Sequence, residues 1–500
     1  MKKFLFLILA VFTVQIASAQ TWALDSSFGT NGIVHTMVGY GSAKGHSVAI
    51  QSDGKIVMVG ETGIAANLQA AVVRFNADGT LDSSFGDDGE VLIPQIGERD
   101  YLLDVAIQSD GKIVASGYTQ VAGDIIVVRL NTDGTLDTSF DTDGIVVIDF
   151  EQVFNIGETV AIQSDGKILI GGDTNDDFML ARLNADGSLD NTFGIAGMAK
   201  TEFGTNPSFV KDITIQADGK IVASGFFIND LSQENFAVAR YNTDGTPDVS
   251  FGTAGMKTID SQSFHAYSEA VCIQSDGKIL LGGHEWIDYG PKYDFTVVRL
   301  LADGSLDNTF GTDGVATARV VDGENYVNDM LVQDDGKIIL AGRTVLGQDY
   351  NFAAARFNSD GSLDLSFTPT GMIDTDVSME AYGEAALIQP DGKIVVAGRA
   401  YNSSTVSEFI MVRYSDGADI SVAEISGSSL TIYPNPANDI LKIETDSRCS
   451  IEVLDLSGKI VFSTIVENQS LVDVSNFASG MYFVRANSNS VNEVIQLIIE

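Results

Sequence analysis

Cysteine is nearly absent from this chain of 500 residues, which contains only Cys272 and Cys449. The repeat pattern described below predicts that the two cysteines lie in different domains, which argues against a disulfide framework. Cys272 stands where other repeat units have alanine, as at Ala49. We therefore interpret Cys272 as a small core residue rather than a reactive thiol.

Histidine and positive charge are also scarce. The four histidines, His35, His46, His265 and His284, show no metal-ligand spacing. The chain has 29 Lys and Arg against 68 Asp and Glu, a formal net charge of −39, which argues against nucleic-acid binding. A Gly-x-Ser-x-Gly elbow, a phosphate loop and a dinucleotide fingerprint are all missing. The sequence therefore predicts no catalytic residue, no metal site and no cofactor.

Long apolar runs are missing after the N-terminus. Lys2 and Lys3 precede an apolar run from Phe4 to Phe12, and Ala17-Ser18-Ala19 follows. These three parts predict a secretory signal peptide over residues 1–19. No later segment reaches about 18 uninterrupted apolar residues, so we expect no membrane helix. With 50 Gly and 44% hydrophobic residues, the composition suits an all-β protein.

The chain does contain a repeat of about 56 residues. Its first motif is Gln51-Ser52-Asp53-Gly54-Lys55, in which Asp53-Gly54 predicts a two-residue hairpin with positive φ angles. The motif glutamine recurs at Gln108, Gln163, Gln216, Gln274, Gln333 and Gln389. Seven copies predict seven structural units.

A second motif, Arg-x-Asn-x-Asp-Gly-x-Leu-Asp-x-Ser-Phe, begins at Arg74 and recurs in each unit, but its seventh copy stops soon after Arg413. The missing half, Leu24 to Gly29, stands near the N-terminus. Such a split predicts a closed ring, a seven-bladed β-propeller over residues 22–417 whose N-terminal strand completes the last blade. We also expect Arg74 and Asp82, with their counterparts, to form one buried ion pair per blade.

Each unit is expected to form four strands, of which the N-terminal one is outermost and the next three run outward from the central channel. In the first unit these strands are predicted at Gly32 to Val38, His46 to Gln51, Ile56 to Gly60 and Ala70 to Phe75. The connection after the last strand is expected to dock Leu81 and Phe85 beneath the sheet.

Two connections per unit are regular and carry Asp-Gly turns, whereas the two on the opposite face vary; we call that face the variable face. Loops on a rigid scaffold commonly carry binding sites. At the mouth of the inner strand, seven places before each motif glutamine, five of seven residues are aromatic. These rings suit stacking on sugars or gripping a peptide, and packing between blades is the alternative. The ligand-binding candidates are Tyr101, Phe209, Tyr267, Trp286, Tyr289, Tyr326 and Tyr382.

The Asn-x-Asp-Gly-x-Leu-Asp turns resemble the middle of an EF-hand loop. Arginine occupies the place of the first ligand, however, and the bidentate glutamate is missing. We expect structural turns, with weak Ca²⁺ binding as the alternative.

A second domain follows the repeats. Residues 418–429, rich in Ser and Ala, are predicted to be a linker, and the alternating apolar segments of residues 430–500 favour a small β-sandwich. Short motifs in this region resemble the C-terminal sorting domain of type IX secretion substrates in Bacteroidetes. They include Tyr433, Pro434, Asn435, Pro436, Gly458, Gly480 and Tyr482. The resemblance implies export across the outer membrane by the type IX machinery, then release or attachment to surface lipopolysaccharide.

The repeat units resemble the delta-60 repeat family of bacterial β-propellers, a resemblance that implies architecture and no chemistry. We therefore expect a secreted or cell-surface protein that binds a glycan or a surface protein without being an enzyme. Two alternatives stay open: a propeller hydrolase or lyase acting on extracellular polysaccharide, and a structural surface component.

Overall fold

In the part of the chain that the computed structural model describes, all regular secondary structure is β-strand. The described residues are 22–64, 67–120, 123–150, 155–259, 265–286, 292–403, 406–416, 430–433, 437, 440–445, 448–454, 459–475, 477, 480–487 and 492–499. The predicted signal peptide and linker lie outside them. The chain divides into two compact units, residues 1–418 and 419–500.

Blade 1 shows how each blade is built. Its antiparallel sheet has the order β3 (Ser42–Ile50), β4 (Ile56–Ile64), β5 (Asn67–Phe75) and β6 (Glu90–Leu92). Residues of β4 alternate between two cores, because successive side chains of a strand point to opposite faces. Those beginning with Ile56 pack toward blade 7, and those beginning with Val57 pack toward blade 2. Burial on both faces explains why the strand is a nearly continuous apolar run.

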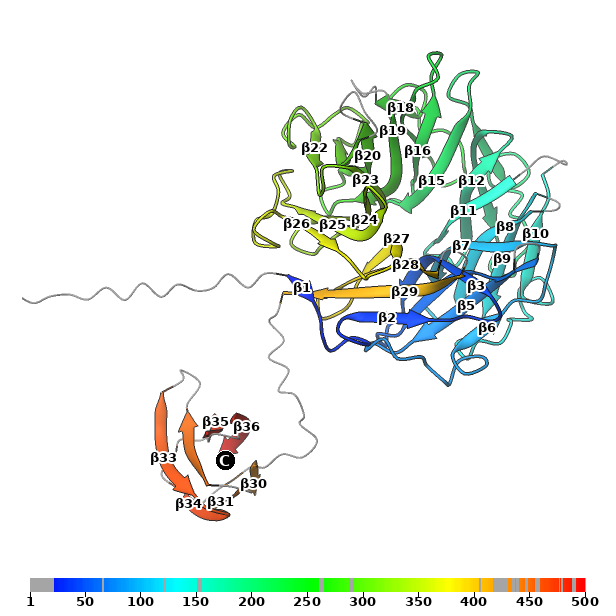
Figure 1. Cartoon of the computed structure of the whole chain (residues 1–500). Helices are drawn as coiled ribbons and strands as arrows, with labels where there is room; N and C mark the ends of the chain where they lie inside the picture. Colours follow the sequence, from blue (N-terminus) through cyan, green and yellow to red (C-terminus); the bar gives the residue numbers. More distant parts are fainter. Residues whose placement is uncertain are drawn as a thin grey trace, which may run out of the picture. The chain divides into compact units, whose positions relative to one another are not determined.

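Blades 2 to 6 repeat this order from the innermost to the outermost strand (Figure 1). Blade 2 has β7 (Asp100–Ile107), β8 (Ile113–Thr119), β9 (Asp124–Leu130) and β10 (Ile145–Ile148). Blade 3 has β11 (Asn155–Ile162), β12 (Ile168–Thr174), β13 (Asp177–Leu183) and β14 (Met198–Thr201). Blade 4 has β15 (Ser208–Ile215), β16 (Ile221–Ile228), β17 (Glu234–Tyr241) and β18 (Met256–Ile259). Blade 5 has β19 (Ala266–Ile273), β20 (Ile279–Trp286), β21 (Tyr293–Leu300) and β22 (Val315–Ala318). Blade 6 has β23 (Glu324–Val332), β24 (Ile338–Leu346), β25 (Asp349–Phe357) and β26 (Met372–Thr375).

Blade 7 joins the two ends of the repeat region. It consists of β27 (Glu380–Ile388), β28 (Ile394–Ser403), β29 (Val406–Ser415) and the N-terminal β2 (Ile33–Thr36), with the short β1 (Ala23–Leu24) also on β29. In Figure 1 the blue β2 lies beside the orange-yellow β29. The innermost strand of each blade contacts that of the next, including β27 with β3. The predicted seven-bladed ring, closed by its N-terminal strand, is confirmed.

The hairpin at the first motif differs from the prediction. Only Gly54 has a positive φ, of 86°, and Asp53 does not. The amide of Gly54 donates to the carbonyl of Gln51, and the amide of Gln51 donates to the carbonyl of Lys55. The connection is therefore a turn followed by a left-handed glycine, a three-residue loop with a bulge, rather than a two-residue hairpin.

One charged cluster holds each blade to its neighbour. Nε of Arg182 is 2.8 Å from Oδ2 of Asp190, which Lys167 also contacts at 2.8 Å. The guanidinium lies over the ring of Phe193 and donates to the carbonyl of Thr243 in the next blade. The predicted ion pair is present in all seven blades, as Arg74–Asp82, Arg129–Asp137, Arg182–Asp190, Arg240–Asp248, Arg299–Asp307, Arg356–Asp364 and Arg413–Asp25. The lysine of the first motif and the arginine and aspartate of the second motif thus form one cluster that joins neighbouring blades.

The docking prediction for the second motif was half right. Phe85 is fully buried, but Leu81 is 39% exposed. Phe85 carries the guanidinium of Arg74 on its ring at 4.4 Å, so its position is fixed by the cluster. Leu81 instead forms an isolated bridge with Phe75 at the edge of the sheet.

The C-terminal unit is a small β-sandwich, as predicted. One sheet has β30 (Leu430–Tyr433), β31 (Ile440–Thr445) and β34 (Gln469–Asp473). The other has β33 (Ile460–Val466), β32 (Cys449–Leu454), β35 (Gly480–Asn487) and β36 (Asn492–Ile499). Residues of both sheets, such as Ile443 and Val484, share one buried core.

Candidate functional site

The residues seven places before the motif glutamines lie on the innermost strands, just before a β-bulge. Tyr326, for example, is followed by a bulge between Val327 and Asp329. We call these half-buried residues the rim ring. Its members are Lys44, Tyr101, Ile156, Phe209, Tyr267, Tyr326 and Tyr382.

A second residue stands directly across the first ladder of each blade. These residues, the partner ring, are Glu61, Tyr118, Asp173, Phe226, His284, Arg343 and Arg399. Sequence reasoning missed them as a set. A signal existed, because each follows its motif glutamine by ten residues, as Arg343 follows Gln333.

A glycine precedes every member of the partner ring. A Cβ atom at Gly342 would lie 2.0 Å from the carbonyl oxygen of Tyr326. The other six glycines are equally crowded, at Gly60, Gly117, Gly172, Gly225, Gly283 and Gly398. Backbone approaches this close need glycine. They bring the bulged inner strand against its neighbour and set rim and partner side chains next to each other.

A row of aromatic rings crosses the mouth over blades 4 to 6; we call it the aromatic row. Ring centroids are 5.1 Å apart for Phe209 and Phe226, and 5.0 Å for Phe226 and Tyr267. The row continues from Tyr267 to His284 and from His284 to Tyr326, at 5.1 Å each. Three of the predicted candidates, together with two partner-ring residues, thus form one continuous surface.

The remaining aromatic candidates lie differently. Trp286 reaches the aromatic row through Tyr293, whose centroid is 6.0 Å away. Tyr101 stands apart in blade 2, stacked on Tyr118 at 4.7 Å. Tyr289 lies outside the described residues.

Arginine continues the row in blades 6 and 7. The guanidinium carbon of Arg343 is 4.6 Å from the ring centroid of Tyr326 and 5.3 Å from that of Tyr382. Arg399 lies over Tyr382 at 4.7 Å and forms an ion pair of 2.9 Å with Glu384. Cation–π contacts of this kind hold both guanidinium groups at the mouth. We call the two arginines the basic arc.

The same positions are acidic in blades 1 and 3. Oε2 of Glu61 is hydrogen-bonded to Nε2 of His46 across 2.6 Å. Burial raises the pKa of Asp173 well above its usual range, and Asp173 accepts a hydrogen bond from the amide of Val210. The partner ring thus carries carboxyl groups in blades 1 and 3 and arginines in blades 6 and 7.

His284 belongs to the row as a neutral ring. Burial, helped by the charge of Arg343, lowers its pKa to about 3. Its Nδ1 lies 3.3 Å from the carbonyl oxygen of Val327, so the Nδ1 proton is donated there.

Beyond the mouth, the bulged residues line the central channel, where a cavity of about 130 Å³ lies. They are His46, Leu103, Glu158, Lys211, Glu269, Asn328 and Glu384. Nζ of Lys211 is 2.9 Å from Oε1 of Glu158. Burial raises the pKa of Glu269 to about 7, although the charge of Lys211 opposes this shift.

Three half-buried aspartates join adjacent blades around the channel. Asp104 accepts hydrogen bonds from the amide of Val105 in its own blade and that of Val160 in the next, both at 2.8 Å. Asp212 and Asp329 do the same in blades 4 and 6. The equivalent residues of blades 1, 3, 5 and 7 are Ser47, Thr159, Ala270 and Ala385. Since backbone amides occupy these carboxylates, their role is structural.

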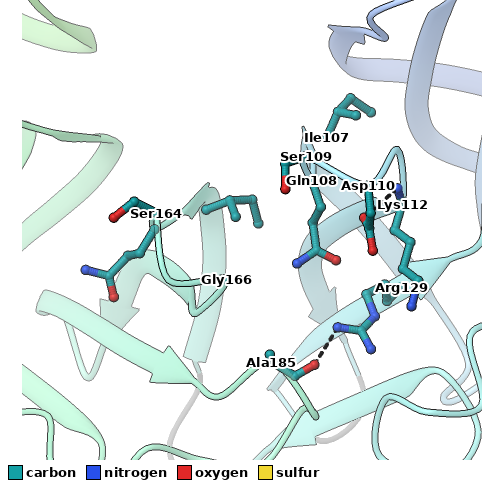
Figure 2. A pocket seen from close by; sticks show the side chains of 11 residues that line it. Ile107, Gln108, Ser109, Asp110, Lys112, Arg129, Ser164, Gly166 and Ala185 are labelled. Atoms are coloured by element: carbon teal, nitrogen blue, oxygen red, sulfur yellow. Dashed lines mark hydrogen bonds between the residues drawn. The ribbon is translucent and has the colours of Figure 1, made fainter.

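Larger cavities lie between blades on the regular face. One of about 590 Å³ separates the Asp-Gly turns of blades 2 and 3 (Figure 2). Figure 2 shows Arg129 on one side, with its hydrogen bond to the carbonyl of Ala185 on the other. Gln274 and Arg299 line an equivalent cavity of about 480 Å³ between blades 5 and 6. Because the repeat cluster itself builds these walls, we place the candidate site at the mouth.

The regular turns use their carboxylates locally. Asp78 accepts hydrogen bonds from the amide and hydroxyl of Thr80, and these bonds lower the pKa of Asp78. Among the described residues, no group of three or more His, Cys, Asp or Glu is arranged to hold a metal ion. Within the same residues, no helix is long and apolar enough to cross a membrane.

Two family models match the chain. The model described as Domain of unknown function (DUF5122) beta-propeller matches seven segments, residues 51–85, 108–140, 163–193, 216–251, 274–310, 333–367 and 389–415. The repeat region is a DUF5122 β-propeller. The model described as Secretion system C-terminal sorting domain matches residues 431–500. These matches confirm the predicted repeats and the type IX sorting domain, and with it export to the cell surface or beyond.

The DUF5122 propeller resembles several solved structures at low identity. PorZ, a bacterial surface component of the type IX secretion system of Porphyromonas gingivalis, is 14% identical with a TM-score of 0.36. That match covers 90% of this chain, which spans 58% of PorZ. The polysaccharide lyase Uly1 is 13% identical with a TM-score of 0.46, over 80% of this chain and 95% of the lyase. These likenesses assign no activity to the propeller. No curated protein matches the chain.

Part of the sorting motif is described. Tyr433 is 40% exposed and donates to Glu444 at 2.7 Å, and Tyr482 is buried beside Phe477. Gly480 has a φ of 150°, in the region that favours glycine. The remaining motif residues, Pro434, Asn435, Pro436 and Gly458, lie outside the described residues.

Proposed function

We propose that this exported propeller is a non-enzymatic binding module that takes a glycan or a protein on its variable face. The aromatic row is the observation that carries this proposal. Its rings are contiguous, most of them are partly exposed, and they lie on a rigid closed scaffold. Rigid aromatic side chains supply contact area at low entropic cost, because few torsions are frozen on binding.

Packing between blades alone would not leave these rings partly exposed. A ring that only fills space between blades becomes fully buried, as Phe193 and Phe251 are. Tyr267 and Tyr326 instead stay only half-buried. A row of this kind suits the flat faces of sugars or the side chains of a protein.

The test is a binding array of glycans and surface proteins, with the mature full chain and two variants, Tyr267→Ala in the aromatic row and Trp286→Ala next to it. We expect each variant to weaken the best ligand by about tenfold or more, as losing an aromatic anchor does. Tyr433→Ala, in the sorting domain, is the matched control and should bind as the wild type does. Binding that both variants leave intact would place the site elsewhere. No binding in the array would favour a structural surface component.

A polysaccharide hydrolase or lyase is the second candidate, favoured by Glu269. A carboxyl with a pKa of about 7 beside Lys211 is suited to exchanging protons at neutral pH. Incubation with extracellular polysaccharides should then release reducing ends or unsaturated products, and Glu269→Gln should abolish the release. We expect no such products from the wild-type protein.

Attachment to lipopolysaccharide, implied by the sorting domain, is also a proposal. Fractionation of the native host would show a membrane-bound form of increased mass if attachment occurs, and a free form of the propeller if it is released.

A further inference from the structure

Arg343 occupies an unusual place for an arginine in so acidic a chain. Its guanidinium lies between the rings of Tyr326 and Tyr382, which belong to adjacent blades. The residue is half-buried, so part of the side chain remains accessible from the mouth. Two flat rings therefore orient the guanidinium without neutralising its charge.

No acid neutralises it either. Among the described residues, no carboxylate lies within ion-pair distance of Arg343, and its enclosed Nε has no hydrogen-bond partner. By contrast, Glu384 compensates Arg399, and an aspartate compensates the arginine of every blade cluster. A guanidinium without a carboxylate partner keeps its full positive charge, and an anion that reaches the accessible part of the Arg343 side chain would compensate it.

We propose that Arg343 is an anion subsite of the variable face and that the ligand is an acidic glycan, whose carboxylate or sulfate pairs with the guanidinium. This inference rests on the proposed binding function. A guanidinium presents donors in a planar fork that matches such oxyanions in a bidentate manner. Arg399, one blade further, adds a second and partly compensated positive charge.

The surroundings favour a glycan over an acidic peptide. A protein anchor commonly fills an apolar pocket at the centre of an interface. The cavity next to the mouth is lined mainly by charged and polar groups such as Lys211 and Glu158. The aromatic row that leads to Arg343 instead offers flat rings in sequence, which suits successive sugar units.

The experiment measures binding of the full chain to charged and uncharged polymers of the same backbone. Polygalacturonate is compared with its methyl ester, and dextran sulfate with dextran, so that the two arms separate carboxylate from sulfate recognition. We expect the charged member of at least one pair to bind more tightly. Arg343→Gln should weaken that binding by about tenfold to a hundredfold, as losing a charge-assisted bond does. Arg343→Lys should restore it only in part, because lysine lacks the fork.

The matched control is Lys257→Gln, which removes one positive charge from the outer strand β18. It should leave binding unchanged, and equal melting temperatures would show that each variant is folded. Poly-L-glutamate tests the acidic-peptide alternative: equal affinity for it, with the same dependence on Arg343, would overturn the glycan assignment. Equal binding of charged and uncharged polymers, or unchanged binding by Arg343→Gln, would overturn the anion subsite. Neutral-glycan binding that is still lost in Tyr267→Ala would leave the proposed function standing.

Discussion

Arg413 and Asp25 stand 388 residues apart in the sequence, and yet Nε of Arg413 lies 2.8 Å from Oδ2 of Asp25 in a buried ion pair. Arg413 also donates to the carbonyl of Ala77 in blade 1 and to Gln389 in its own blade. The closing blade is thus held by the same cluster as the other six, assembled here from both ends of the repeat region.

Removing one partner of this cluster should destabilise the ring. Arg413→Ala or Arg182→Ala leaves a buried aspartate with only its lysine partner. Removing one partner of a buried ion pair typically costs about 3–5 kcal/mol of unfolding free energy. Lys292→Ala breaks the exposed pair with Asp322 and should cost about 1 kcal/mol at most. Thermal and urea unfolding of the three variants measure the contrast. Equal melting temperatures would contradict a structural role for the cluster.

Acid should weaken the ring through the same aspartates. Burial by itself would raise the pKa of Asp25, but hydrogen bonds from Ser27 and the charges of Arg413 and Lys393 outweigh it and lower the value to about 2. A lowered pKa contributes stability above the unfolded value, and this contribution disappears as the pH falls from about 4 to about 2. Urea unfolding across this range should show the loss, and Asp25→Asn should reduce it by the share of this one blade. A pH-independent midpoint would disprove the linkage.

Glu269 should act in the opposite direction. Because burial raises its pKa to about 7, the folded state favours the protonated carboxyl. This preference stabilises the fold at acid pH and is lost as the pH rises from about 4.5 through 7. Glu269→Gln, which stays neutral, should therefore gain in melting temperature relative to the wild type between pH 5 and pH 8. A constant difference between the two proteins across that range would refute the shifted pKa.

The glycines before the partner ring should tolerate no side chain. Gly342→Ala brings a Cβ atom against the carbonyl of Tyr326, and we expect a cost of at least about 1–3 kcal/mol, the usual range for overpacking. Gly347→Ala is the matched control in the next hairpin, where no atom lies within 4 Å and only the positive φ of 71° is strained. Circular dichroism melts should rank Gly342→Ala below Gly347→Ala, and the reverse order would falsify the steric argument.

The ring could be predicted from the sequence because the same two motifs recur in all seven units. Seven copies of one motif pair, with the final copy split between Arg413 and Leu24, leave few other arrangements open. The buried ion pairs followed from the fixed spacing of Arg74 and Asp82. The turn at Asp53 was predicted wrongly because Asp-Gly suits both a two-residue hairpin and a turn with a bulge, and only the hydrogen bonds separate them.

The site was harder to predict because it depends on register. Tyr326 and Tyr382 were identified in the sequence as aromatic candidates, but Arg343 was not. Its place between the two rings follows from the pairing of its strand with that of Tyr326 and from the packing of blade 7, which carries Tyr382, against blade 6. The bulge that faces Glu269 into the channel leaves no local sign in the sequence. The constant spacing from the motif glutamine was the one available signal. It locates the partner-ring residues, but it does not show what they bind.

The bridging aspartates occur in every second blade, in blades 2, 4 and 6. Seven is an odd number, so a pattern that alternates from blade to blade must break once on the way round. At the seven described positions the break falls between Ala385 of blade 7 and Ser47 of blade 1, where neither side supplies a carboxylate. That junction is also where the N-terminal strand completes the circle. Because the number of blades is odd, one junction of the ring lacks the bridging aspartate. The ion pair of Arg413 with Asp25 holds the two ends of the repeat region together there.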